Sequence, residues 1–106
     1  MSVESLDDSS FDAAVAVGAC AVDFFATWCG PCRMMAPLFE SVAAEMAGRP
    51  VKFFRVDVDK APAAAGRFGV QSIPTLLVLK DGVETGVSVG VTPPAKLRRM
   101  VEDALS

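Results

Sequence analysis

An apolar segment that leads directly into a helical segment sets the framework of this chain. Residues 19–26 are apolar except for one charge, Asp23. A continuously apolar strand is typical of the centre of a parallel sheet, where both faces are covered. Pro31 suits the first turn of a helix, where its missing N–H is not needed, and we expect this helix to cover residues 31–47. The pattern therefore predicts a buried strand followed closely by a helix N-terminus.

Two cysteines, Cys29 and Cys32, lie at this junction. Side chains at positions i and i+3 of a helix share one face, about 5–6 Å apart. A disulfide needs a Cα separation of roughly 4.4–6.8 Å, so the pair can open and close a disulfide with little backbone movement. Thiol–disulfide exchange uses these two states, because one thiolate attacks a disulfide and a second thiol resolves the mixed intermediate.

The remaining segments alternate between strand and helix patterns. We predict strands over residues 2–6, 19–26, 51–58, 75–80 and 83–91, and helices that begin after Ser9 or Ser10, at residues 31 and 61, and after Thr92. Asp59 is the predicted cap of the third helix, and Asp81-Gly82 is the predicted hairpin turn. Pro37 lies inside the second helix, where we expect a kink.

This order of elements is β-α-β-α-β-α-β-β-α. Its alternating first part predicts parallel strands, and its last two strands predict an antiparallel hairpin. We therefore expect an α/β fold with one mixed sheet of five strands flanked by four helices, in a single domain over residues 1–106.

Composition narrows the class of protein. The chain is 52% hydrophobic and 22% charged, which excludes a disordered chain. Its net charge is −3 and no stripe of lysine or arginine is present, so we expect no nucleic-acid partner. No apolar run reaches the ~18–20 residues that span a bilayer, so we expect no membrane segment. Histidine and tyrosine are absent and cannot supply a base or a metal ligand.

The cysteine count suits a reducing compartment. There are three cysteines, two of them in the CxxC motif, which fits a redox motif better than a secreted disulfide framework. The segment before residue 13 carries acidic residues and no lysine or arginine, which argues against a secretory signal. We therefore expect a cytoplasmic protein.

The two cysteines of the motif have different expected roles. Cys29 lies at a helix N-terminus, where free N–H groups and the helix dipole stabilise a thiolate, so it is the candidate attacking group. Cys32 lies one turn inside and is the candidate resolving thiol. A static disulfide and a zinc site remain alternatives, the latter needing Cys20 and a carboxylate as further ligands. We interpret Cys20 as a small buried hydrophobe.

Asp23 is the unusual charge of the apolar strand. Burial should raise its pKa unless it finds a partner, and a raised pKa suits a group that takes a proton from Cys32. The alternative is a polar residue that bonds to the backbone and specifies the fold. Arg55, on the strand over residues 51–58, either approaches Asp23 and lowers its pKa or reaches solvent.

Residues 22–32 (VDFFATWCGPC) resemble the active-site segment of the thioredoxin family. The resemblance continues in order through Pro37, residues 57–59, residues 73–75, the Asp81-Gly82 turn and Gly90. It covers nearly the whole chain and implies a thioredoxin fold, with the activity of a protein-disulfide reductase that carries electrons. Phe25 departs from the tryptophan or tyrosine often found in the family, and we interpret it as core packing.

The resemblance also implies further site residues. It implies that Asp23 acts through water beneath Cys32, and that the bond before Pro74 is cis, leaving the Ile73 backbone to pair with an extended client segment. An apolar docking surface is expected from residues on three segments, with flat positions at the glycines: Trp28, Gly30, Ile73, Gly90 and Val91.

The resemblance also bears on the residues that adjust the acidity of the cysteine pair and of Asp23. The pair Gly30 and Pro31 resembles that of reducing members. Arg55 stands where the family usually carries lysine, so the tuning of Asp23 can differ here, because arginine holds its charge more firmly.

The expected partners follow from this reaction. They are disulfide-containing client proteins and thioredoxin reductase, the family's usual electron donor, and we expect a monomer that holds no organic cofactor or metal. Two other classes stay open: a binding module whose cysteines are idle, and a small structural zinc protein.

Overall fold

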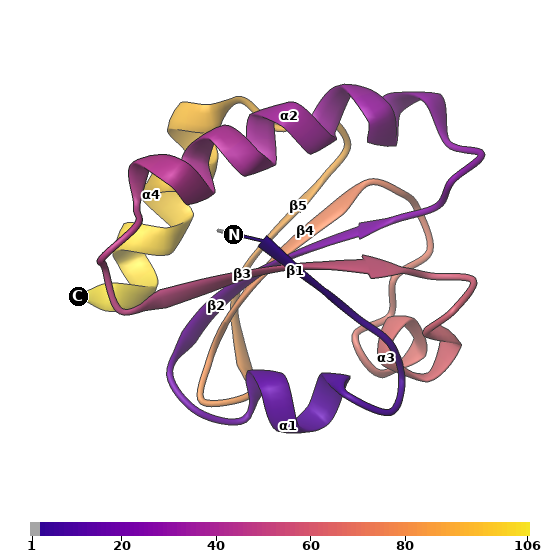
Figure 1. The fold of residues 1–106 in the computed structure, drawn as a ribbon, viewed down its shortest axis with the longest axis horizontal. Helices are drawn as coiled ribbons and strands as arrows, with labels where there is room; N and C mark the ends of the chain where they lie inside the picture. Colours follow the sequence, from indigo (N-terminus) through magenta and orange to yellow (C-terminus); the bar gives the residue numbers. More distant parts are fainter. Residues whose placement is uncertain (1–2) are drawn as a thin grey trace.

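A computed structural model of the protein describes residues 3–106 (Figure 1). Its elements, in chain order, are β1 (Val3–Leu6), α1 (Phe11–Val15), β2 (Ala19–Phe25), α2 (Gly30–Glu45), β3 (Val51–Asp57), α3 (Pro62–Arg67), β4 (Thr75–Lys80), β5 (Val83–Val89) and α4 (Pro94–Leu105). This order confirms the predicted alternation. Ser2, the first residue of the predicted opening strand, lies outside the described residues.

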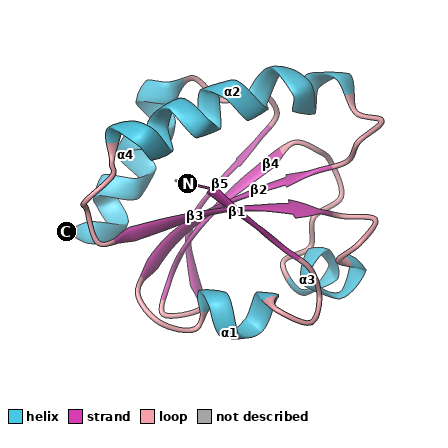
Figure 2. Ribbon diagram, viewed as in Figure 1, coloured by secondary structure: helices cyan, strands magenta, loops and turns pink. Residues whose placement is uncertain are grey.

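The five strands form one mixed sheet in the order β1-β3-β2-β4-β5. β1 and β2 pair parallel with β3, whereas β4 pairs antiparallel with both β2 and β5. β2 is therefore the central strand, and all its residues except the last are buried. Helices α2 and α4 cover one face of the sheet and α1 and α3 cover the other (Figures 1 and 2).

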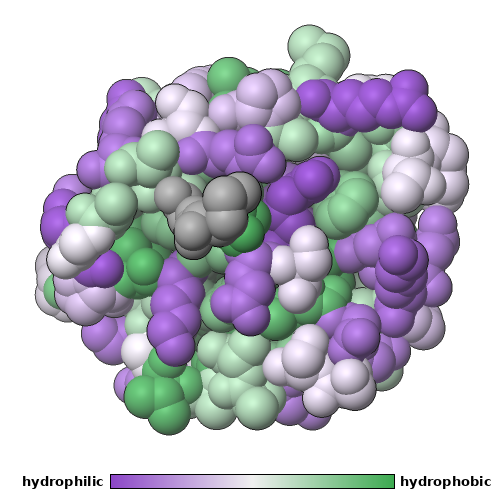
Figure 3. Space-filling view, viewed as in Figure 1, coloured by the Kyte–Doolittle hydropathy of each residue, from purple (hydrophilic) through white to green (hydrophobic). Residues whose placement is uncertain are grey.

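Apolar side chains fill the space between the sheet and each helix layer. On the side of α1 and α3, the ring of Phe11 lies 6.2 Å from that of Phe24 and 5.9 Å from that of Phe68. On the side of α2 and α4, the rings of Phe39 and Phe53 lie 5.5 Å apart. Full burial of one such side chain contributes roughly 1.5–3 kcal/mol. Outside, hydrophilic and hydrophobic side chains are interspersed on the face seen in Figure 3.

The N-terminus of α3 is capped from a distant segment. Asp59 was the predicted cap, but Ala61 occupies the cap position and makes no side-chain bond. The carboxylate of Asp8 instead accepts hydrogen bonds from the N–H groups of Ala63 and Ala64, at 3.0 and 2.9 Å. A side chain 55 residues away therefore satisfies the free donors of this helix.

The predicted caps of α4 and α1 are also wrong in part. Thr92 is not the cap of α4, because Pro93 holds that position. The two residues after Thr92 are prolines, which have no N–H for its side chain to bond. The buried hydroxyl of Thr92 lies 2.7 Å from that of Ser88 instead. Ser10 does hold the cap position of α1, but its side chain makes no capping bond and accepts one from the N–H of Asp7 at 3.0 Å.

The hairpin between β4 and β5 has the predicted turn. Asp81 and Gly82 both have positive φ angles, 52° and 79°, as a two-residue hairpin turn requires. β5 ends earlier than predicted, because Gly90 takes a φ of 92° and turns the chain. Pro37 lies inside α2, and the kink expected there stays a prediction.

The helices are short or carry charged residues. Within residues 3–106, none combines the length and the apolar character needed to cross a membrane.

Candidate functional site

Strand β2 is followed by a short loop and then by the start of α2, where Cys29 and Cys32 form a disulfide. Their Cα atoms lie 5.3 Å apart, within the range that a disulfide needs. Cys29 is the cap residue of α2, and its sulfur accepts a hydrogen bond from the N–H of Cys32 at 3.2 Å. The exposed fraction is 5% for Cys29 and 1% for Cys32, so the first cysteine is the more accessible one.

The first turn of α2 provides the electrostatic setting of Cys29. Its sulfur lies where the positive end of the helix dipole and a backbone N–H both favour negative charge. Pro31 lies in this first turn, where its missing N–H costs no helical hydrogen bond. Gly30 has no side chain, and a Cβ at this position would meet nothing within 4 Å.

The loop before β4 lies directly beside the disulfide. The peptide bond between Ile73 and Pro74 is cis, as the resemblance implied. The Ile73 carbonyl oxygen lies 3.8 Å from the sulfur of Cys29. The carbonyl of the buried Pro74 accepts a hydrogen bond from the N–H of Gly90 at 2.8 Å. The predicted site residues of two segments are therefore brought together next to Cys29.

Trp28 is a surface residue beside the pair. Two thirds of it (67%) is exposed, which favours the interpretation as a platform over that of a core anchor. Its indole N–H donates a hydrogen bond to the Asp59 carboxylate at 2.9 Å. Asp59, the predicted cap of α3, therefore binds Trp28 instead. Val91 is also exposed, at 42%, whereas Ile73 is half-buried.

Asp23 lies fully buried on β2 and meets one cation. One carboxylate oxygen accepts a hydrogen bond from Nε of Arg55 at 3.2 Å, and the other has no partner among the described residues. Burial raises the pKa of Asp23 to about 6, while the charge and hydrogen bond of Arg55 oppose the rise and the charge of Glu40 adds to it. Arg55 therefore approaches Asp23 rather than only reaching solvent, and the backbone partner considered for Asp23 is not seen.

Phe25 was predicted to be core packing and has a further contact. It is half-buried and packs against the cluster formed by Ala26, Cys29 and Cys32. The guanidinium carbon of Arg55 lies 3.8 Å from the centre of its ring, in a cation–π arrangement. The sequence carried no signal for this stack, because it depends on how β2 and β3 align.

A cavity of about 330 Å³ lies on the side of Cys32, lined by residues from the end of β2, the loop that follows it, α2 and β3: Phe25, Ala26, Thr27, Cys32, Arg33, Ala36 and Arg55. Its polar side chains are Thr27, Arg33 and Arg55, and the rest of its lining is apolar. Cys32 and Arg55 thus border the same cavity.

Cys20 lies apart from this pair. It packs in the cluster under α1 and α3, and burial raises the pKa of its thiol to about 11. A zinc site would need it to join Cys29 and Cys32. Within residues 3–106, no group of three or more cysteine, histidine or acidic side chains is placed to hold a metal ion.

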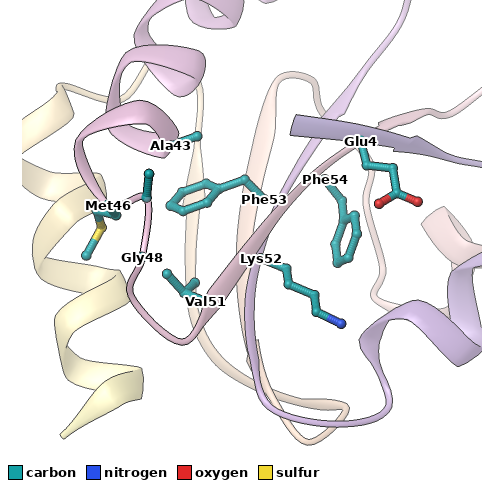
Figure 4. Close-up of a pocket in the computed structure, with 9 residues that line it drawn as sticks. Glu4, Ala43, Met46, Gly48, Val51, Lys52, Phe53 and Phe54 are labelled. Atoms are coloured by element: carbon teal, nitrogen blue, oxygen red, sulfur yellow. The ribbon is translucent and has the colours of Figure 1, made fainter. Parts of the chain in front are cut away.

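A second cavity, of about 470 Å³, lies where β3 begins (Figure 4). Side chains from β1, the end of α2 and β3 line it, among them Glu4, Met46, Lys52 and Phe53. Since β2 and β3 are parallel and the disulfide follows the end of β2, this cavity lies at the opposite end of the sheet. It borders neither cysteine of the pair and we assign it no chemistry.

Known proteins match this chain along its length. The family model described as Thioredoxin matches residues 2–103. The chain is 45% identical over 105 residues to the thioredoxin of Bacillus subtilis and 42% identical to that of Staphylococcus saprophyticus, with 99% of this chain and 100% of each relative covered. The crystal structure of Malassezia sympodialis thioredoxin (Mala s 13) superimposes with a TM-score of 0.86 at 34% identity, covering 98% of this chain and 91% of that one. With its Cys29–Cys32 pair at the start of α2, the chain belongs to the thioredoxin family and has the function of a thioredoxin-type disulfide reductase.

Proposed function

We propose that Cys29 is the attacking group when this protein reduces a client disulfide. In the reduced protein, the Cys29 thiolate forms a bond to one client sulfur, and the client's S–S bond breaks to release the other sulfur as a thiolate. The observation that carries this assignment is the place of the Cys29 sulfur at the cap of α2, with a backbone N–H directed at it. Cys29 is also the more exposed cysteine of the pair.

In the second step, Cys32 resolves the mixed disulfide. Its thiol gives a proton to Asp23, and the resulting thiolate attacks the sulfur of Cys29 and displaces the remaining client thiolate. Two electrons thereby pass to the client, and the Cys29–Cys32 disulfide forms. The pKa of about 6 supports Asp23 as the acceptor, because it is closer to neutral pH than that of an exposed aspartate. Cys32 and Arg55, the ion-pair partner of Asp23, line the same cavity, which supports a short path between Cys32 and Asp23.

The client binds, in this proposal, across the apolar surface around Cys29. Trp28 and Val91 supply exposed apolar area, and Gly90 keeps the surface flat. The backbone of Ile73, next to the Cys29 sulfur, pairs with an extended client segment as an added strand would. Pro74 and its contact with Gly90 hold this loop in place.

Thioredoxin reductase is the proposed electron donor that returns the disulfide to two thiols. No cofactor is proposed for the chain itself, and a cytoplasmic location is proposed because reducing compartments keep such dithiols reduced. The proposed donor is tested by adding a bacterial thioredoxin reductase and NADPH to the oxidised protein. NADPH consumption that depends on the Cys29–Cys32 pair is the expected result, and none would contradict the proposed donor.

Reduction of insulin with dithiothreitol tests the role of the pair. Cys29→Ser should abolish the acceleration given by the wild type, whereas Cys20→Ala, a change at the buried third cysteine, should keep it. Full activity of Cys29→Ser would overturn the assigned role of Cys29, and no acceleration by the wild type would favour a binding module with idle cysteines.

The order of attack needs a separate measurement. Cys32→Ser should accumulate a stable mixed disulfide with insulin or another disulfide client, visible by non-reducing electrophoresis, because the resolving thiol is missing. Cys29→Ser should accumulate none. The reverse pattern would assign the attack to Cys32.

A further inference from the structure

The side chain of Arg55 contacts both Phe25 and Asp23 on the neighbouring strand. Asp23 and Phe25 are two residues apart on β2, so their side chains leave the same face of the sheet. In the parallel register, Arg55 lies opposite Asp23, and Phe25 lies opposite Asp57. The Arg55 side chain bonds Asp23 through Nε at 3.2 Å and places its guanidinium carbon 3.8 Å from the Phe25 ring centre. One guanidinium therefore contacts two successive positions on this face of the neighbouring strand.

We propose that Phe25 is a positioning residue for the reaction: its ring holds the Arg55 guanidinium against the buried carboxyl group of Asp23. The consequence for catalysis rests on the proposed function, in which Asp23 accepts the proton of Cys32. The placement of Arg55 by Phe25 does not depend on that role and is measured separately below.

Two contacts are needed because arginine is long and flexible. The side chain of Arg55 is still 20% exposed, so a route to solvent is open to it. A hydrogen bond through Nε fixes one point of the guanidinium, and stacking on an aromatic face fixes its plane. The ring itself is held, since Phe25 packs against the cluster of Ala26, Cys29 and Cys32. A lysine at this position would offer a point charge without a plane to stack.

Few other charges act on Asp23, so the position of the Arg55 guanidinium matters for the pKa of Asp23. Among the described residues, Arg55 on β3 lowers the pKa of Asp23 and Glu40 on α2 raises it. The β4 residue opposite Asp23 is Leu76, which is apolar and buried. The two cysteines of the redox pair, Cys29 and Cys32, are joined in the disulfide and carry no charge here.

Asp57 lies two residues after Arg55 on the same face of β3, opposite Phe25. Its carboxylate accepts a hydrogen bond from the N–H of Asp59 at 2.9 Å. If Arg55 moves toward solvent, burial and Glu40 are left acting on Asp23, and its pKa rises. Asp23 is then protonated over a wider pH range and cannot accept a proton there.

The test is the pKa of Asp23 in the folded, oxidised protein, read from its carboxyl ¹³C chemical shift as pH is varied. Phe25→Leu removes the aromatic face and should raise this pKa by about half a unit, the scale of one exposed cation–π contact. Phe25→Trp keeps an aromatic face and should keep the wild-type value. Arg55→Met removes the cation and should raise the pKa by about one unit or more.

The matched control is Phe24→Leu, the same change at the next residue, whose side chain packs on the other face of β2 under α1. It should leave the pKa of Asp23 unchanged. Phe25→Met serves as a second non-aromatic variant and should behave like Phe25→Leu. If Arg55→Met raises the pKa and both non-aromatic variants keep the wild-type value, Phe25 does not position Arg55 and the inference is overturned.

The pH profile of insulin reduction separates this inference from the proposed function. We expect the profile of Phe25→Leu to shift toward higher pH together with the pKa. If the pKa of Asp23 shifts and the profile does not, the placement of Arg55 stands, and the proposed role of Asp23 as proton acceptor fails.

Discussion

Replacing Asp23 with asparagine should stabilise the oxidised protein at neutral pH and have little effect on stability in acid. Asp23 is fully buried, and burial raises its pKa from 3.8 to about 6. In the unfolded chain the same carboxyl group ionises near 3.8. Between these two values the unfolded state therefore binds fewer protons than the folded state, and the free energy of unfolding falls as pH rises.

The size of this effect follows from the two pKa values. Their difference of about 2 units corresponds to roughly 3 kcal/mol, at 1.36 kcal/mol per unit. The wild type loses this stability between about pH 4 and pH 6, and the variant, which has no ionisable group there, does not. Because the asparagine amide oxygen can still accept the hydrogen bond from Arg55, we expect most of this difference to appear at pH 7.

Urea denaturation of the oxidised wild type and of Asp23→Asn at pH 4, 5, 6 and 7 measures this difference in the free energy of unfolding. The two midpoints should be close at pH 4, and the variant should gain on the wild type up to about pH 6. Asp103→Asn, the same change at an exposed position of α4, controls for the substitution itself and should show no comparable trend. A difference between wild type and Asp23→Asn that stays constant from pH 4 to pH 7 would refute the raised pKa.

Three further substitutions test other contacts. Asp8→Ala should lower the free energy of unfolding by about 1–2 kcal/mol in urea denaturation, because it removes both bonds to the start of α3; an unchanged midpoint would contradict the cap. Arg49→Gln should leave the unfolding midpoint nearly unchanged in the same assay, since its ion pair with Glu102 is exposed, and a drop as large as that of Asp8→Ala would contradict this expectation. Asp59→Ala should release the indole of Trp28 and change the emission of the single tryptophan while the unfolding midpoint moves little; identical emission would mean that the bond does not hold the ring.

The parts of the site that were predictable from sequence are local ones. The spacing of Cys29 and Cys32 and the strand-to-helix junction lie within one short segment, so their geometry follows from helix geometry alone. A charge within an apolar strand likewise marks Asp23 as a buried group, because a central strand has no face open to water. The cis bond before Pro74 came from the family resemblance and not from the residues themselves.

The parts that were not predictable depend on alignment between distant segments. Whether Arg55 reaches Asp23 is decided by the register of β2 against β3, which the composition of either strand does not specify. The stack on Phe25 depends on the same register. The cap of α3 was missed for a similar reason, since the nearby Asp59 fits the local pattern and the distant Asp8 does not.

The hydrogen bonds that Asp8 accepts from α3 limit how far this protein can be shortened. Helix α3 spans Pro62–Arg67, far fewer residues than an isolated helix needs for stability in water. A trimmed version that began at β2 would keep both redox cysteines, but it would lose an edge strand and also the group that completes the start of α3. The opening segment of the chain is therefore an integral support of the helix layer formed by α1 and α3, and a minimal redox unit has to retain it.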